Sequence, residues 1–129
     1  MSIYKEKKVL ITGASAGIGY ALSEELAKRG AEVIITARRK DRLEELATKI
    51  ESAGGKAHIF TEDLSLPESG MKLYDQIKSA GLKVDILINN AGYGRWGELT
   101  SHERDDYSKM LQLNVTTLTD LCHLYIPDM

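Results

Sequence analysis

Three glycines between an apolar segment and a helical pattern have the spacing of a phosphate-binding turn. The stretch TGASAGIG places Gly13, Gly17 and Gly19 directly after the apolar run at residues 8–12. A phosphate group needs close approach of the backbone, free N–H donors and a helix N-terminus, and glycine permits this approach because it has no Cβ. We expect Gly13 to form the tight turn, Gly17 to admit a pyrophosphate and Gly19 to let the helix pack on the strand. The alternative is a tight turn without a ligand. A P-loop is not expected, because no Gly-Lys-Ser/Thr follows.

Basic residues occupy the place where dinucleotide-binding folds usually carry a carboxylate. An Asp or Glu at the end of the second strand commonly bonds the adenosine ribose. Residues 36–40 are TARRK and contain no carboxylate. Because the planar guanidinium of arginine bonds phosphate bidentately, Arg38 and Arg39 favour a 2′-phosphate, and therefore NADP(H) over NAD(H). The alternative is that this basic segment only opens a solvated helix.

The elements that position these residues alternate between strand and helix patterns. Apolar runs predict strands at residues 8–12, 33–35, 56–61 and 84–89. Helical spacing predicts helices at residues 17–29, around 43–50, from a capping box at Ser65-x-x-Glu68 to Gly81, and from a second capping box at Thr100-x-x-Glu103 to near Pro127.

This order of elements predicts an α/β fold. Continuous rather than alternating apolar strands are covered on both faces, and right-handed crossovers then produce a parallel sheet. We therefore expect a Rossmann-type doubly wound parallel sheet of about four strands in the order 3-2-1-4, with helices on both faces. Residues 1–129 are expected to form one dinucleotide-binding domain.

Composition and charge argue against several classes of protein. The net charge is -2, whereas a nucleic-acid-binding protein needs a basic face. No apolar run reaches the roughly 18–20 residues of a membrane span, and no signal-peptide pattern follows Met1. The single cysteine, Cys122, gives no disulfide framework, and the three histidines have no metal-ligand spacing, so no metal site is predicted. We expect a cytoplasmic protein that binds neither membranes nor nucleic acid.

Taken in order, the motifs resemble the N-terminal half of a short-chain dehydrogenase/reductase. They are TGASAGIG at 12–19, Asp63-Leu64 after the third predicted strand, and NNAG at 89–92 after the fourth. The resemblance extends over essentially the whole chain. It implies an oxidoreductase that transfers a hydride between the nicotinamide cofactor and a carbonyl or secondary alcohol of a small-molecule substrate.

The resemblance implies that residues following each of the four strands bind the cofactor. These residues are Gly13, Ser15, Gly17, Ile18, Gly19, Arg38, Arg39, Asp63, Leu64, Asn90, Ala91 and Gly92. Ser15 and Ile18 would contact phosphates and ribose, and Asp63 would bond the adenine amino group beside a backbone contact from Leu64. Residues 90–92 would line the ribose nearest the nicotinamide, and Asn89 would tie neighbouring strands together.

One residue of the family's catalytic machinery is implied, Asn114. In the family this asparagine bends the fourth helix, and its backbone carbonyl holds a water of the proton relay. The family's general acid–base Tyr, the Lys four residues later and a Ser lie beyond the end of this sequence. The Tyr-x-x-x-Lys strings at 4–8 and 74–78 would not face the nicotinamide. We expect a truncated part of a larger subunit that is inactive alone.

The fourth strand and the last helix are expected to be contact surfaces. The strand at 84–89 would lie at a sheet edge, and an unpaired apolar edge invites pairing. The last helix carries a second apolar set, Met110, Leu113, Leu121 and Leu124, and in the family this helix packs against another subunit. We expect a homo-oligomer through one of these surfaces, or a marginally stable chain. Trp96, in the loop after the asparagine turn, is expected to pack rather than to contact a substrate.

Three other functions stay open at this point. One is a naturally short module that holds a dinucleotide without turnover, and another is an NAD(H)-dependent member of the same family. The third is a structural domain with a vestigial loop.

Overall fold

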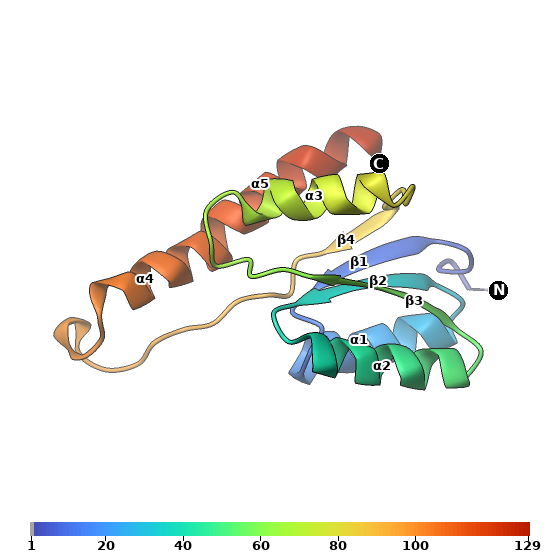
Figure 1. Cartoon of the computed structure of the whole chain (residues 1–129), viewed down its shortest axis with the longest axis horizontal. Helices are drawn as coiled ribbons and strands as arrows, with labels where there is room; N and C mark the ends of the chain where they lie inside the picture. The colour runs from blue at the N-terminus through green and yellow to red at the C-terminus, as the bar shows by residue number, and fades with distance from the viewer. Residues whose placement is uncertain (1) are drawn as a thin grey trace.

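Four parallel strands form the central sheet in the computed structural model, which describes residues 2–129 (Figure 1). They are β1 (Lys8–Thr12), β2 (Glu32–Ala37), β3 (Lys56–Thr61) and β4 (Ile86–Ile88). Their order is β3-β2-β1-β4, so the predicted 3-2-1-4 order is confirmed. The strand β1 lies between β2 and β4, so Ile11 of β1 is paired with Ile35 of β2 on one side and with Ile88 of β4 on the other.

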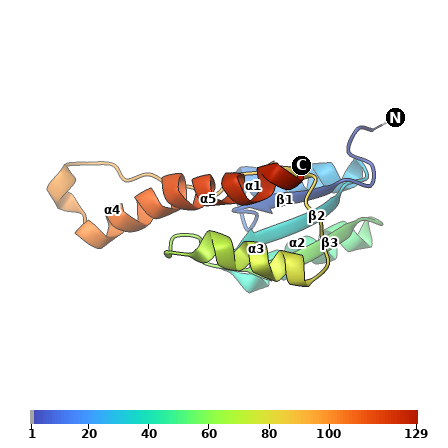
Figure 2. The same ribbon diagram turned by 90° about the horizontal axis from the view of Figure 1, so that it is seen from above.

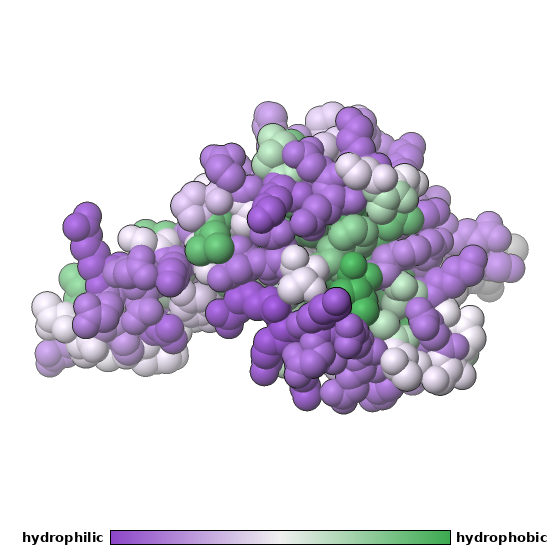
Figure 3. All heavy atoms as spheres, viewed as in Figure 1, coloured by the Kyte–Doolittle hydropathy of each residue, from purple (hydrophilic) through white to green (hydrophobic). Residues whose placement is uncertain are grey.

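Two layers of helices cover the sheet. The helices α1 (Gly17–Lys28) and α2 (Lys40–Ser52) lie on one face, and α3 (Ser69–Ser79) and α5 (Leu118–Tyr125) lie on the other (Figures 1 and 2). Successive strand residues point to opposite faces, so Ile11 and Ile35 pack on the first layer, while Leu10 and Ile34 pack on the second. This double coverage is why the strands are continuous apolar runs. Figure 3 shows hydrophilic side chains over the outer side of α2, and apolar surface over β3, between the two layers.

The predicted start of the third helix at a Ser65-x-x-Glu68 capping box is wrong. Asp63 Oδ1 accepts hydrogen bonds from the Ser65 backbone N–H (3.0 Å) and hydroxyl (2.6 Å), so Ser65 belongs to a turn held by the aspartate. The helix α3 instead begins at Ser69, after Glu68 with a left-handed φ of 66°.

The second predicted capping box, Thr100-x-x-Glu103, is also wrong. Thr100 lies in the 3-10 turn η1 (Leu99–Ser101). The helix α4 (Arg104–Leu111) begins after Glu103, which is its N-cap residue and makes no side-chain capping hydrogen bond.

The predicted long C-terminal helix is present, but its middle is not α-helical. After α4 come a π-helical segment, η2 (Gln112–Thr117), then α5 and a final 3-10 turn, η3 (Ile126–Asp128). A π-helical turn holds more residues than an α-turn, so it rotates the side chains that follow it. Figures 1 and 2 show α4 projecting beyond the end of the sheet, whereas α5 lies beside α3.

The apolar residues of the C-terminal helix that face outward differ from the predicted set. Leu121 is buried and Leu113 packs against the core with α3, so the predicted outward set of residues is wrong at these two positions. The exposed apolar residues are Leu111 (58% exposed), Val115 (55%) and Ile126 (62%). We call these three residues the outer helix stripe.

The strand β4 lies at the sheet edge, and in residues 2–129 it pairs with β1 alone. It is shorter than the predicted strand at 84–89, although the backbone N–H of Asp85 still donates to the Lys8 carbonyl (2.9 Å). In the loop that follows, Trp96 is 94% exposed, so the packing role predicted for its side chain is wrong. Within the described chain, none of the helices combines the length and apolarity needed to cross a membrane.

Candidate functional site

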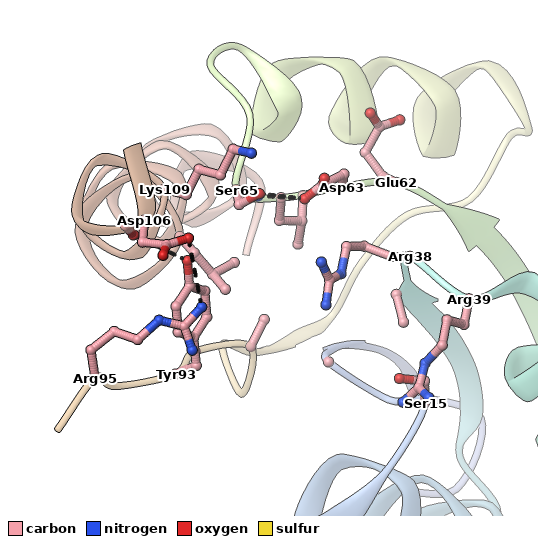
Figure 4. Close-up of a pocket in the computed structure, with 16 residues that line it drawn as sticks. Ser15, Arg38, Arg39, Glu62, Asp63, Ser65, Tyr93, Arg95, Asp106 and Lys109 are labelled. Carbon is pink, nitrogen blue, oxygen red and sulfur yellow. Dashed lines mark hydrogen bonds and ion pairs between the residues drawn. The ribbon is translucent and has the colours of Figure 1, made fainter. Parts of the chain in front are cut away.

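A cavity of about 530 Å³ lies at the carboxyl ends of the strands, where the loops after all four strands meet (Figure 4). Open parallel sheets commonly bind ligands in this crevice. Eight of the predicted cofactor-binding residues line it: Gly13, Ser15, Arg38, Arg39, Asp63, Leu64, Ala91 and Gly92. The remaining predicted residues are absent from this lining: Gly17, Ile18, Gly19, Asn90 and Asn114.

The first and third glycines of the loop are required by close packing. Gly13 has a φ of 67°, and a Cβ there would lie 2.9 Å from the Ala91 Cα. A Cβ on Gly19 would collide with the Gly13 carbonyl oxygen and the Asn90 side chain. Gly17 differs, because its φ of 59° favours glycine while the space around it is open. The loop therefore packs tightly on the turn after β4 and stays open where α1 begins.

The start of α1 is free to receive an anion. Its N-cap residue, Ala16, makes no side-chain capping hydrogen bond, and the first turn contains no acidic residue. The first backbone N–H groups of a helix lack partners within the helix and carry its positive dipole end. Ile18, in this first turn, is 77% exposed and points away from the core.

The turn after β4 is held by Asn90. Its side-chain amide donates to the carbonyl oxygens of Thr12 (3.1 Å) and Gly13 (3.2 Å). The Thr12 hydroxyl accepts from the backbone N–H groups of Asn90 (3.0 Å) and Ala91 (2.9 Å). Asn89, which was predicted to tie the strands, instead donates to Cys122 Sγ on α5 (3.3 Å). Adjacent residues leaving a strand point to opposite sides, so Asn89 and Asn90 have separate partners. The strand contact predicted for Asn89 is made by Asn90 instead.

Arg38 and Arg39 approach the cavity in different directions. Figure 4 shows the Arg38 side chain pointing into the cavity on the side of Asp63, and that of Arg39 extending toward Ser15. The neighbouring Lys40 and Arg42 pair with Glu44 and Glu45, but in residues 2–129 neither Arg38 nor Arg39 forms an ion pair. Both guanidinium groups are therefore available to an anionic ligand.

Asp63 is an ionised acceptor opposite these cations. Burial raises the pKa of its carboxyl group, but the two hydrogen bonds from Ser65 and the charges of Arg38 and Lys109 outweigh this effect and hold the pKa below its ordinary value. The Ser65 bonds both go to Oδ1. The second carboxylate oxygen can therefore accept a hydrogen bond from a ligand.

Asn114 lies in the π-helical segment and holds the loop after the turn. Its side chain donates to the Tyr93 carbonyl (2.7 Å) and accepts from the Tyr93 backbone N–H (3.1 Å). A Cβ on Gly92 would lie 3.0 Å from Asn114 Oδ1, so this position leaves little room for a larger residue. Asn114 itself is exposed.

The wall formed by α4 and the loop after β4 was not predicted. Its residues include Tyr93, Arg95, Asp106 and Lys109. The Arg95 guanidinium lies over the Tyr93 ring (4.9 Å) and 3.8 Å from Asp106, and the Tyr93 hydroxyl donates to the Asp106 carbonyl (3.4 Å). The helical spacing of 106, 109 and 113 was a signal that these residues share a face.

The local Tyr-x-x-x-Lys strings lie away from the cavity, as predicted. Tyr74 packs edge-on against Tyr125 between α3 and α5, with a centroid distance of 5.0 Å, and neither it nor Tyr4 lines the cavity. Within residues 2–129, no group of three or more His, Cys, Asp or Glu is arranged to hold a metal ion.

The comparisons with known sequences identify oxidoreductases. An uncharacterized oxidoreductase of Mycobacterium tuberculosis is 39% identical over 130 residues, which cover 97% of this chain and 38% of the relative. A fatty acyl-CoA reductase of Acinetobacter baylyi is 42% identical over 112 residues, which cover 85% of this chain and 38% of the relative. The chain thus spans less than half the length of these relatives.

The comparisons with solved structures agree. L-sorbose reductase of Gluconobacter frateurii, complexed with NADPH and L-sorbose, superposes with a TM-score of 0.89 at 32% identity, over 100% of this chain and 49% of that one. A 3-oxoacyl (acyl-carrier-protein) reductase of Agrobacterium tumefaciens with NADP bound superposes with a TM-score of 0.88 at 30% identity, over 98% of this chain and 48% of that one. The sequence model of the short chain dehydrogenases matches residues 7–129. With the predicted motifs lining one cavity of a doubly wound sheet, the chain belongs to the short-chain dehydrogenase family.

Proposed function

We propose that the chain is the NADP(H)-binding part of a short-chain oxidoreductase that transfers a hydride between NADP(H) and a carbonyl or secondary alcohol. One observation carries the proposal: Arg38 and Arg39, which form no ion pair within residues 2–129, line the same cavity as the glycine turn. Such a cavity suits a ligand that carries a pyrophosphate for the start of α1 and a separate phosphate for the two guanidinium groups. On this proposal, residues 1–129 form one dinucleotide-binding domain.

The lining residues have the chemistry that each part of the cofactor needs. The pyrophosphate would bind at the glycine turn and the start of α1, with Ser15, Gly17 and Ile18 beside it, and Arg38 with Arg39 would bind the 2′-phosphate. The carboxylate oxygen of Asp63 that Ser65 does not bond would accept a hydrogen bond from the adenine amino group, next to Leu64. Ala91 and Gly92, held in place by Asn90, would line the ribose nearest the nicotinamide.

The bound cofactor supplies the hydride, and the protein must supply proton transfer. The cavity wall contains one tyrosine among the described residues, Tyr93, whose hydroxyl donates to a backbone carbonyl, and the residue four positions later is Gly97. No Tyr-x-x-x-Lys pair therefore faces the cavity within residues 2–129. We propose that Asn114 contributes to a proton relay only in a longer protein, and that the 129 residues alone bind cofactor without turnover.

Solved relatives support the preference for NADP(H). The sorbose reductase is complexed with NADPH and the oxoacyl reductase has NADP bound. NAD(H) is the alternative cofactor, because the adenine, ribose and pyrophosphate contacts are common to both. A small-molecule substrate and a cytoplasmic location are further parts of the proposal.

Titration of the purified chain with NADPH and with NADH, followed by calorimetry and nicotinamide fluorescence, tests the proposal. We expect binding of both cofactors, with NADPH the tighter. Heat from neither cofactor would contradict the proposal and favour a structural domain. Consumption of NADPH by the 129 residues with a panel of ketones and aldehydes would contradict the proposed lack of turnover.

A further inference from the structure

Arg42 is a third arginine near the site, and its contacts differ from those of Arg38 and Arg39. It lies in the first turn of α2, and its Nε–H donates to the backbone carbonyl of Ser15 in the glycine turn (3.3 Å). Its guanidinium also lies 3.7 Å from Glu45 and 5.9 Å from the centre of the Tyr20 ring on α1. The side chain thus joins α2 to the turn and to the first helix.

We propose that Arg42 is a positioning residue, which holds the Ser15 carbonyl away from the bound pyrophosphate. This inference rests on the proposed cofactor function. The Ser15 carbonyl oxygen is the negative end of a peptide dipole, and a rotation of this peptide toward the cavity would set it against the phosphate charge. The bond from Arg42 fixes the opposite orientation, in which the carbonyl faces α2.

A second hydrogen bond ties the turn to β2. The Ala14 backbone N–H donates to the Thr36 carbonyl of β2 (3.2 Å), one residue before the Ser15 carbonyl. The next residue, Ala16, has no side-chain cap to anchor it. The β2–α2 unit therefore restrains the turn on both sides of the 14–15 peptide, through the bond from the Ala14 N–H to Thr36 and the bond from Arg42 to the Ser15 carbonyl.

Arg42 does not act as a direct phosphate ligand in this arrangement. Among the described residues, Arg38 and Arg39 line the cavity, whereas Arg42 is not part of the lining and pairs with Glu45. Because the pyrophosphate is common to NADPH and NADH, loss of a positioning contact must weaken both cofactors alike. Loss of a direct contact with the 2′-phosphate would weaken NADPH alone.

Two substitutions at this position separate the hydrogen bond from the charge. Arg42→Gln keeps an N–H group at the place of Nε and removes the charge, whereas Arg42→Met puts a methyl group there. We expect Arg42→Met to raise the Kd for NADPH and for NADH by a similar factor, about five- to tenfold, the cost of one partly exposed hydrogen bond. Arg42→Gln should stay within about twofold of the wild type. Amide hydrogen exchange at residues 14–19 should be faster in Arg42→Met alone.

Arg29→Met is the matched control, because Arg29 also donates an Nε hydrogen bond on a helix, to Glu25 (3.0 Å), but lies at the far end of α1. It should leave both Kd values unchanged. The inference is overturned if Arg42→Met binds normally, if Arg42→Gln loses as much affinity as Arg42→Met, or if the loss is confined to NADPH. Urea unfolding of each variant shows that the folded protein was titrated. A wild-type chain that binds neither cofactor would instead contradict the proposed function.

Discussion

Arg38 and Arg39 are adjacent in the sequence, yet they offer their charges to different parts of the cavity (Figure 4). Arg38 lies on the side of Asp63, and Arg39 extends toward Ser15. Their positions follow from the end of β2, where successive residues point to opposite sides. If Asp63 binds the adenine amino group as proposed, the 2′-phosphate of the same adenosine would lie nearer to Arg38 than to Arg39, because Arg38 is on the side of Asp63.

Arg38→Asp should therefore change cofactor preference. We expect the Kd for NADPH to rise by at least about tenfold, because a charge-assisted bond to phosphate is lost and a like charge is introduced. The Kd for NADH should change little, since its ribose hydroxyls can donate to the new carboxylate. Calorimetric titration with both cofactors measures the ratio of the Kd for NADPH to the Kd for NADH. Arg29→Asp, on the exposed end of α1, is the control, and an unchanged ratio in Arg38→Asp would remove the assignment.

The two asparagines of the turn should differ in their contribution to stability. Asn90→Ala leaves the carbonyl oxygens of Thr12 and Gly13 without their partner, which should lower the free energy of unfolding by about 1–3 kcal/mol. Asn89→Ala loses a single bond to sulfur and should cost less than about 1 kcal/mol. Urea unfolding of both variants makes the comparison. Equal losses would mean that Asn89 shares the strand contact that the hydrogen bonds assign to Asn90.

At the scale of elements, the strands β1, β2 and β3 are joined at their amino ends by charged residues. Glu32 on β2 is bonded to His58 on β3 (2.6 Å) and lies 3.6 Å from Lys8 on β1. The hydrogen bond from His58 lowers the pKa of the Glu32 carboxyl; burial opposes this, and the charge of Lys8 adds to the lowering. This group lies at the opposite end of the sheet from the cavity, so its effect is on stability.

The lowered pKa of Glu32 predicts a loss of stability in acid. A carboxyl group whose pKa is lower in the folded state stabilises the fold above its unfolded pKa, about 4.5, and this stabilisation is lost as the pH falls through the folded value. The free energy of unfolding of the wild type should therefore fall more steeply below about pH 5 than that of Glu32→Gln. Urea unfolding between pH 3 and 7 measures both slopes, with Glu25→Gln as an exposed control. Parallel curves for wild type and Glu32→Gln would contradict the assignment.

The elements that sequence predicted well are those whose signal is local and apolar. The strands β1 to β3 were found within a residue or two, because buried parallel strands are continuous apolar runs. Both capping boxes failed because the same residue types also form turns, as Ser65 does with Asp63. The π-helical segment contains Asn114, the residue that the family resemblance implied would bend this helix, whereas the cavity wall around Arg95 depends on contacts between the loop after β4 and α4. Such contacts are not encoded in the spacing of either segment alone.

At the scale of the whole molecule, two surfaces lack a covering layer in residues 2–129. The strand β4 has a neighbour only on the β1 side, and the outer helix stripe exposes Leu111, Val115 and Ile126. The chain spans less than half the length of the relatives described above. Both surfaces are therefore candidates for association with other protein, and we propose that in the isolated chain they contact a second copy.

Self-association of the purified chain is the expected consequence. Exposed apolar helix residues and a free strand edge both lower the free energy on burial, so light scattering should report dimers or larger species at high micromolar concentration. Val115→Glu puts a charge in the middle of the outer helix stripe and should shift the species toward monomer. Met71→Glu, on the outward side of α3 and 43% exposed, is the matched control and should not. If Val115→Glu associates as the wild type does, the association is assigned to the β4 edge rather than to the outer helix stripe. A wild type that stays monomeric and well folded at this concentration contradicts association through either surface.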